Sequence, residues 1–364
     1  MDRFHVVKEL APALFGSIVL CVDKNNGNHV AIKRMQLAAA AKRQANGGPT
    51  VQEDLHVEKR VYRHVNKMGG HRNILRLLSS FEEAGHEHFV LEYCHQGDLF
   101  TILQSSPHQR LQASQALHYM RQICHGLAFL HSHEIAHGDI SLENVLVDAN
   151  DVAKLMDFGL AVESFHVTQP SSAVGKFFYM PPEMYLGSPY DASKADMWSL
   201  GILLLILHTG MPPFARAHSS DNVYASYLKY DIRTLLKGWN VLPHLPVDAL
   251  DLVERLVVAT PDKRLSISDV RTHKCCRSSC VFTVVRRCSD TRTLPNTKHC
   301  SVTTIRCQVC SLPRTNSNTT SRPRRIQHQR TRRRRAVCTG SSRRCSGRRR
   351  RRTSRGSSAR RSRP

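Results

Sequence analysis

The sequence has no apolar run long enough to span a membrane, because its most apolar stretch, Leu200 to Leu207, is eight residues long. A spanning helix needs about 20 apolar residues in succession. A convincing secretory signal is also missing, since Lys8 and Glu9 directly precede the apolar stretch from Leu10 to Val22. No internal repeat is recognisable. These absences exclude an integral membrane protein and a repeat array, and we expect the protein in the cytoplasm.

The C-terminal part, residues 274–364, has almost no acidic residues or aromatic rings. It holds one acidic residue, one Phe and neither Trp nor Tyr, but 27 of the chain's 53 Lys and Arg residues. Such a composition cannot bury a core, so we predict a disordered Arg-rich tail. Its arginine runs, at 332–335 and 348–352, favour binding to nucleic acid or another polyanion, or import into the nucleus.

Nine of the twelve cysteines also lie in this tail. The spacings Cys276-x₃-Cys280 and Cys307-x₂-Cys310 are weak candidates for zinc ligands, because no helix or strand pattern surrounds them. The abrupt change of composition at residue 274 is also what a shifted reading frame would produce. The three cysteines outside the tail are predicted to be reduced, buried thiols: Cys21, Cys94 and Cys124.

Residues 1–273 have the opposite character, with 26 basic and 28 acidic residues. This part is nearly neutral and long enough to bury a sizeable core. In its middle, the segment H-G-D-I-S-L-E-N (137–144) runs into a short apolar strand, and D-F-G (157–159) follows another. The two strands should pair and bring Asp139, Asn144 and Asp157 together. Two carboxylates and an amide suit Mg²⁺ bound to substrate phosphates, and one carboxylate can orient a hydroxyl nucleophile.

These two motifs, in this order and spacing, resemble the catalytic core of the eukaryotic protein kinase superfamily. The resemblance covers residues 5–273 and implies an α+β, two-lobe protein kinase fold. The small β-rich lobe (about 5–93) would carry one key helix, and the larger lobe (94–273) would be mostly helical. The implied activity is that of a serine/threonine kinase that uses ATP and Mg²⁺ on protein substrates. Asp139 would be catalytic, and Asn144 and Asp157 would hold the metal.

Val30-Ala31-Ile32-Lys33 resembles the family's third strand, which makes Lys33 the expected partner of the nucleotide phosphates. Periodicity predicts an amphipathic helix from about Val51 to Val65. We prefer Glu58 in this helix as the carboxylate that pairs with Lys33, with Glu53 and Asp54 as the alternatives. Residues 38–49 between strand and helix are predicted to form a mobile loop. Further strands are expected at 73–77 and 88–91, and a core helix at 111–133.

The glycine-rich phosphate loop of the family is degenerate here. Only Gly16 remains of its three glycines, within Ala11-Pro12-Ala13-Leu14-Phe15-Gly16-Ser17-Ile18. Glycine lets backbone N–H groups approach phosphates closely, so nucleotide binding should be weaker than usual. Asp98 is expected to reach the ribose or to cap the next helix, or both. The resemblance assigns the ATP site to Ala11, Gly16, Ile18, Ala31, Lys33, Leu91, Glu92, Cys94, Asp98 and Leu146.

Three further departures concern the catalytic machinery. Gly138 replaces an Arg that meets a phosphorylated activation-segment residue, which favours activity independent of that switch. Ser141 replaces a Lys that helps to neutralise the transferring phosphate, so a lower rate is expected. Lys176 stands where serine/threonine kinases typically have Thr. The activation segment, residues 157–183, contains four candidate phosphorylation sites: Ser164, Thr168, Ser171 and Ser172.

The resemblance implies that Glu183 and Asp196 support the large lobe. Glu183 is expected to pair with Arg264, and Asp196 is expected to brace the catalytic loop, residues 137–144. Two functions follow. The preferred one is an active serine/threonine kinase, because the metal and positioning groups are all present. The alternative is a pseudokinase that acts as a binding or scaffold module, which the degenerate loop, Gly138 and Ser141 favour.

Overall fold

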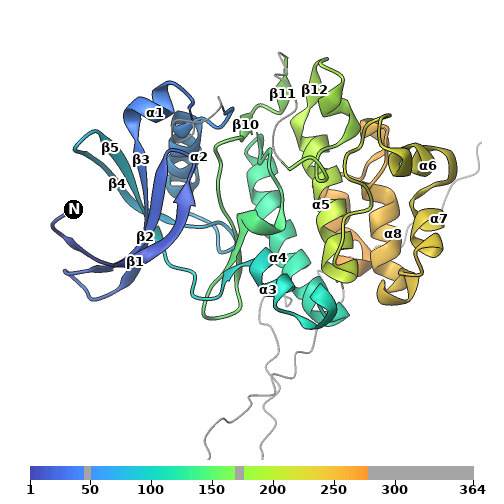
Figure 1. Ribbon diagram of the computed structural model, residues 1–364, viewed down its shortest axis with the longest axis horizontal. Helices are drawn as coiled ribbons and strands as arrows, with labels where there is room; N and C mark the ends of the chain where they lie inside the picture. The colour runs from blue at the N-terminus through green and yellow to red at the C-terminus, as the bar shows by residue number, and fades with distance from the viewer. Residues whose placement is uncertain (45–50, 169–175, 278–364) are drawn as a thin grey trace, which may run out of the picture. The chain divides into compact units, whose positions relative to one another are not determined.

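The computed structural model describes residues 1–44, 51–168 and 176–277, all of which belong to one compact unit, Met1–Val281. Its N-terminal lobe is built on a five-stranded antiparallel sheet of order β1-β2-β3-β5-β4. Helix α2 lies beside this sheet, as Figure 1 shows. The elements of this lobe are β1 (Phe4–Ala13), β2 (Gly16–Asp23), β3 (His29–Gln36), α1 (Leu37–Ala41), α2 (Leu55–Lys67), β4 (Leu77–Glu83) and β5 (His86–Glu92).

The start of α2 differs from the prediction. The helix begins at Leu55 rather than at Val51, because the Asp54 side chain caps it by accepting hydrogen bonds from the backbone N–H groups of His56 and Val57. Its buried face carries Val61 and Tyr62. The Tyr62 ring meets Phe158 edge to face with 5.0 Å between centroids, so the helix is fixed against the D-F-G motif.

Two other local predictions need correction. The strand expected at 73–77 begins only at Leu77, although Ile74 and Leu75 are buried and join the large lobe through Leu155. Part of the loop expected at 38–49 is helical, since α1 ends at Ala41. Residues 45–50 lie outside the described residues.

The C-terminal lobe is mostly helical, and helices α4 and α5 pass through its core (Figure 1). Helix α4 (Ala113–Ser132) lies inside the range predicted for the core helix, 111–133. Within the described ranges, no helix is long and apolar enough to cross a membrane. The helices are α3 (Leu99–Gln104), α4 (Ala113–Ser132), α5 (Ala192–Thr209), α6 (Asn222–Tyr230), α7 (Ile232–Gly238), α8 (Val247–Leu256), α9 (Ile267–Thr272) and α10 (Lys274–Arg277).

Short strands and 3₁₀ turns carry the polar motifs of this lobe. The predicted strand pair is β8 with β9, and the register places Val145 opposite Leu155. The strands are β6 (Gly97–Asp98), β7 (Ile135–Ala136), β8 (Val145–Val147), β9 (Ala153–Leu155), β10 (Val162–Glu163), β11 (His166–Val167) and β12 (Tyr190–Asp191). The 3₁₀ turns are η2 (Pro107–Gln109), η3 (Leu142–Asn144), η4 (Pro182–Tyr185), η5 (Leu242–His244) and η6 (Pro261–Lys263).

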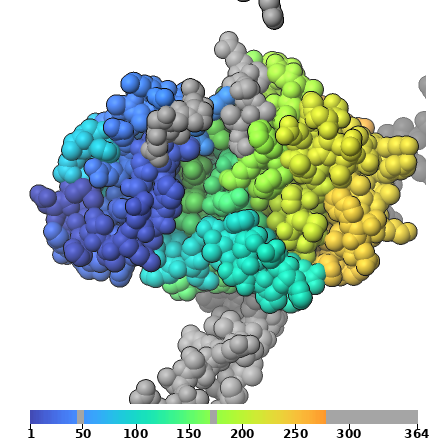
Figure 2. Space-filling view, viewed as in Figure 1, coloured from blue at the N-terminus to red at the C-terminus, as the bar shows by residue number. Residues whose placement is uncertain are grey.

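This architecture confirms the predicted fold class for the globular part. Cys21, Cys94 and Cys124 are buried, free thiols, as expected. The disorder predicted from residue 274 is wrong for the first four residues, because 274–277 form helix α10 and bury Cys275. From residue 278 onward the predicted tail lies outside the described residues, so its disorder, its zinc sites and its polyanion binding stay predictions. In the space-filling view, the blue surface of the first strands borders the cyan surface that includes α3 (Figure 2).

Candidate active site

A cavity of about 710 Å³ lies where the sheet meets the helical lobe. Strands β1 to β3 and the segment after β5 form one side, and the catalytic loop and the D-F-G motif form the other. Of the ten residues assigned to ATP, nine line this cavity, namely Ala11, Ile18, Ala31, Lys33, Leu91, Glu92, Cys94, Asp98 and Leu146. Gly16 is not among the lining residues.

The surviving glycine of the loop has a different structural role. A Cβ on Gly16 would lie 2.1 Å from the carbonyl oxygen of Arg34, so only glycine lets β2 approach β3 here. Ala11, Pro12 and Ala13 line the cavity as part of β1, which continues up to a two-residue turn before β2. The wall of the cavity is therefore a β-hairpin that carries side chains, with register shifts between Val6 and Lys8 and between Glu9 and Ala11.

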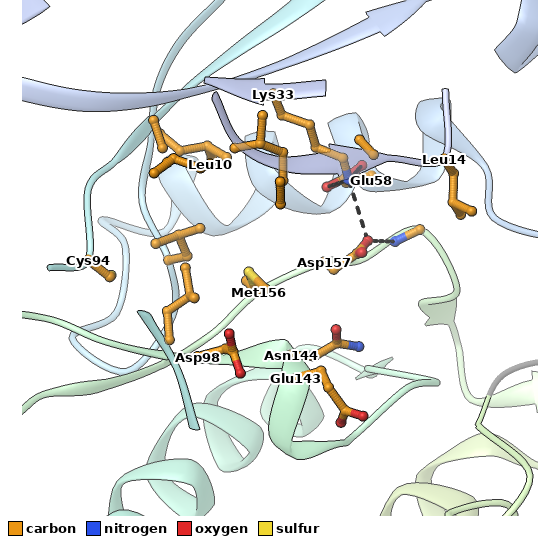
Figure 3. Close-up of a pocket in the computed structure, with 18 of the residues that line it drawn as sticks. Leu10, Leu14, Lys33, Glu58, Cys94, Asp98, Glu143, Asn144, Met156 and Asp157 are labelled. Carbon is orange, nitrogen blue, oxygen red and sulfur yellow. Dashed lines mark hydrogen bonds and ion pairs between the residues drawn. The ribbon is translucent and has the colours of Figure 1, made fainter. Parts of the chain in front are cut away.

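Lys33 is held between two carboxylates. Its Nζ lies 2.8 Å from each carboxylate oxygen of Glu58 and 3.6 Å from Oδ1 of Asp157 (Figure 3). Burial opposes its charged form, but the Asp157 and Glu58 carboxylates outweigh burial and raise the pKa of Lys33 above its usual value. The preferred partner, Glu58, is the one that the structure places on Lys33. Asp54 instead caps α2 and bonds Arg43.

The catalytic loop positions Asp139 and Asn144 on the opposite wall. The Nδ2 group of Asn144 donates to the backbone carbonyl of Asp139 at 2.8 Å and to its Oδ2 at 2.7 Å. Both bonds use the amide nitrogen, and the amide oxygen is the atom that a metal ion would take. Burial raises the pKa of Asp157, but Lys33 and the backbone N–H of Gly159 outweigh it, so that pKa lies below its usual value.

The loop backbone rests on α5. Oδ2 of Asp196 accepts from the N–H of His137 at 2.8 Å, and Oδ1 accepts from the N–H of Gly138 at 3.0 Å. The ring of His131 also contacts Asp196, at 2.9 Å. Asp196 is 1% exposed, so these partners replace water around a buried carboxylate.

A second support lies at the end of the activation segment. Arg264 donates through Nη1 and Nη2 to the two oxygens of Glu183, at 2.6 and 2.7 Å. It also donates to the carbonyls of Val258 and Lys194. The expected pair is therefore a bidentate, buried one.

The sequence does not predict the observed positions of two charged residues at the site. Glu53, just before α2, lines the cavity, and burial together with the nearby Asp157 carboxylate raises the pKa of Glu53 to about 7. Lys176 extends from the activation segment to Asp139 and Ser141. Both residues stood out in the sequence, Glu53 as a possible Lys33 partner and Lys176 as a departure from the family, but their positions depend on how distant segments meet.

The charge of the cavity fits a metal-bound nucleotide. Eight carboxylic side chains and two ammonium groups line it in the described part of the chain. Polyphosphate would be repelled unless further cations accompany it. No group of three His, Cys, Asp or Glu side chains that could hold a metal occurs among the described residues. Asn144 and Asp157 would thus supply part of a Mg²⁺ shell that phosphate oxygens complete.

Known proteins resemble this chain over the region that holds the site. The family described as "Protein kinase domain" matches residues 4–276. An Aurora kinase of Yarrowia lipolytica is 32% identical over 275 residues, which are 75% of this chain and 68% of that protein. An Aurora kinase of Schizosaccharomyces pombe is 29% identical and is covered to 71%. A serine/threonine-protein kinase of Arabidopsis thaliana is 27% identical over 278 residues and is covered to 73%.

Proposed function

The chain belongs to the protein kinase family, of the serine/threonine type, and we propose that its cavity transfers the γ-phosphoryl group of Mg-ATP to serine or threonine hydroxyls of protein substrates. One observation carries this proposal: Lys33 is bound to Glu58 and lies beside Asp157, on the same cavity as Asp139 and Asn144. Phosphoryl transfer needs positioned charges rather than covalent chemistry, and these groups are already assembled.

Each of these groups has a distinct role. Lys33 holds the nucleotide phosphates, and Glu58 fixes the Lys33 ammonium in place. Asn144 and Asp157 hold Mg²⁺, which supplies neutralising charge to the phosphates when it is bound. Asp139 orients the substrate hydroxyl and takes up its proton, and the bond from Asn144 keeps this carboxylate in position.

The test is a phosphotransfer assay on the full chain. It uses Mg-ATP and a generic basic protein substrate, followed by phosphoamino-acid analysis. We expect phosphoserine or phosphothreonine from the intact chain, and a loss of at least about 10²-fold for Asp139→Asn and Asp157→Ala, because each removes a positioned charge. Asp262→Asn, at an exposed position in η6, is the matched control and should keep full activity.

The second candidate is a binding module with little catalysis. The hairpin that replaces a glycine-rich loop favours it, since Ala11, Pro12 and Ala13 limit the approach of the backbone to phosphates. Absence of phosphotransfer by the intact chain, together with no thermal shift on addition of Mg-ATP, would replace the kinase proposal with this one. Label on tyrosine would keep the enzyme and overturn the substrate class.

The Arg-rich segment supports a separate proposal. Residues 274–364 carry 27 Lys and Arg against one acidic residue, so we propose that they bind nucleic acid or another polyanion, in the cytoplasm or after import into the nucleus. Binding of the full chain to a duplex oligonucleotide should weaken steeply as salt rises. A chain that ends at residue 277 should lose this binding, and equal binding without the segment would rule the proposal out.

A further inference from the structure

The activation segment delivers a cation into the catalytic loop. Nζ of Lys176 donates to Oγ of Ser141 at 2.8 Å and to Oδ2 of Asp139 at 3.2 Å. The same Asp139 oxygen accepts from Nδ2 of Asn144. The Ser141 residue is 0% exposed, and the Lys176 side chain is 28% exposed and lines the cavity. The ammonium group therefore lies on the carboxylate that we assign to the substrate hydroxyl.

Two departures from the family thus meet at a single contact. The family pattern has Lys at position 141 and Thr at position 176, whereas this chain has Ser and Lys at those positions. In this chain an ammonium–hydroxyl contact lies beside Asp139, with the lysine on the activation segment and the hydroxyl on the catalytic loop. We propose that Lys176 is a catalytic residue that neutralises the transferring phosphoryl group, in place of the missing catalytic-loop lysine.

The distribution of charge supports this assignment. Lys33 and Lys176 are the only Lys or Arg side chains that line the cavity in the part of the chain that the structure describes. Lys33 is already bound to both oxygens of Glu58 and lies near Asp157. A phosphoryl group next to Asp139 would otherwise meet only carboxylates among these cavity-lining charges. Lys176 is the side chain that supplies a positive charge at that end of the cavity.

The backbone around Lys176 is tied to the catalytic loop. The carbonyl of Lys176 accepts from the N–H of Tyr179 at 2.8 Å, and the Tyr179 hydroxyl accepts from the N–H of Leu142 at 3.2 Å. Ser199 in α5 donates to the Tyr179 carbonyl. These bonds hold the turn that carries Lys176 against the segment that carries Ser141, so the contact is part of the fold rather than a chance meeting of exposed side chains.

The proposal rests on the proposed kinase activity and specifies one of its steps. The substrate hydroxyl oxygen forms a bond to the γ-phosphorus, while the bond between that phosphorus and the β–γ bridging oxygen breaks and ADP leaves with the electron pair. The hydroxyl proton goes to Asp139. An ammonium has three N–H donors, and Ser141 and Asp139 take two of them. The third can bind an oxygen of the moving phosphoryl group, and Lys176 gives up no proton.

The experiment compares full-length Lys176→Met, Lys176→Thr and the double variant Ser141→Lys/Lys176→Thr with the unaltered chain. Lys176→Met should lower kcat by about 10²-fold, because a preformed donor to developing charge is removed. The KM for ATP should change less than threefold, since Lys33 remains. The double variant carries the family arrangement and should recover at least tenfold over Lys176→Thr. Lys237→Met, at an exposed position in α7, controls for loss of a surface charge.

The possible outcomes separate this inference from the kinase proposal. If the unaltered chain is inactive, the kinase proposal fails and this inference falls with it. If the unaltered chain is active and Asp139→Asn is not, then full activity of Lys176→Met overturns the inference alone. Higher activity of Lys176→Met would also overturn it, because Lys176 would then be blocking Asp139. Failure of Ser141→Lys to restore activity in the double variant would contradict the replacement of the catalytic-loop lysine by Lys176.

Discussion

The carbonyl oxygen of Leu160 occupies the space that a side chain on Gly138 would need. An ideal Cβ on Gly138 would lie 2.1 Å from that oxygen, and Gly138 has a φ of +78°. The residue that replaces the family's arginine is therefore required by this backbone and is more than the loss of a phosphate receptor. Leu160 directly follows the D-F-G motif, so the contact joins the catalytic loop to the segment that carries Asp157.

From this relationship we predict that Gly138→Ala lowers the free energy of unfolding by at least about 2 kcal/mol, because positive φ and a backbone clash add together. Activity should fall with it, since Leu160 cannot move without shifting Asp157. Denaturant unfolding of the full chain measures the first effect and the phosphotransfer assay the second. Gly187→Ala is the control, because Gly187 also has positive φ (+64°) but nothing within 4 Å of its Cβ position. Equal losses for the two variants would contradict the clash.

A second prediction concerns the buried pair of Arg264 and Glu183. Arg264→Met should lower the free energy of unfolding by about 3–5 kcal/mol, because it leaves the Glu183 carboxylate buried without its partner. Arg264→Lys should recover only part of this loss, since a lysine cannot form both parallel bonds. Urea unfolding followed by circular dichroism gives these values.

The matched control for this pair is Arg233→Met. Arg233 also forms a bidentate pair, through Nε and Nη2 to Glu254, but its side chain is 54% exposed. An exposed pair contributes about 0–1 kcal/mol, so the control should be close to the unaltered chain. Similar losses at Arg264 and Arg233 would mean that burial does not govern the strength of these pairs.

Short motifs with fixed spacing were the part of this site that could be predicted. Lys33 and Glu58 each lie in a local pattern, a β-branched strand and an amphipathic helix, and the structure brings them together. The sequence could not exclude Glu53 and Asp54 as partners, because three acidic residues share the start of one helix. The structure places Glu58 on Lys33, whereas the Asp54 side chain caps the N-terminus of α2. This cap also moves the helix start from Val51 to Leu55.

The contacts that could not be predicted join segments far apart in the sequence. Ser141 and Lys176 each depart from the family pattern. Nothing in the local sequence indicates that the Lys176 ammonium, 35 residues away, contacts the Ser141 hydroxyl. The contact of His131 with Asp196 is of the same kind, since a histidine on a helix gives no sign that a carboxylate from α5 lies beside it. Such contacts follow from the packing of α4, α5 and the activation segment, which periodicity alone does not determine.

A third prediction is a pH dependence of stability caused by Glu53. Burial and the Asp157 carboxylate raise the pKa of Glu53 from 4.5 to about 7, with Asp139 and Glu58 adding in the same direction and Lys33 opposing. A raised pKa means that the folded state favours the protonated form. The stability gained from that proton is present below pH 4.5 and is lost as the pH rises through 7.

Glu53→Gln carries a neutral side chain of the same shape and should escape this loss. As the pH rises from 5 to 8, the free energy of unfolding of the variant should increase by about 1–2 kcal/mol relative to that of the unaltered chain. This value is smaller than the full pKa shift would give, because the Glu53 carboxyl is partly exposed. Glu58 is unchanged in both proteins, so its own titration cancels in the comparison. Thermal unfolding at several pH values measures the difference, and a constant difference across this range would show that Glu53 has an ordinary pKa.

The last prediction concerns the hairpin that replaces the glycine-rich loop. Ala11 and Ala13 line the cavity from β1, and we expect their Cβ atoms to limit the approach of the backbone N–H groups to a phosphate. Ala11→Gly/Ala13→Gly should therefore lower the KM for ATP severalfold and leave kcat within a factor of about two, since the improvement concerns binding more than the transition state. Gly16→Ala should act differently and destabilise the lobe, because the Arg34 carbonyl leaves no room for a Cβ. A double glycine variant with unchanged KM would show that the hairpin does not limit nucleotide affinity, and that the sheet–helix cavity binds phosphate through Lys33 and the metal alone.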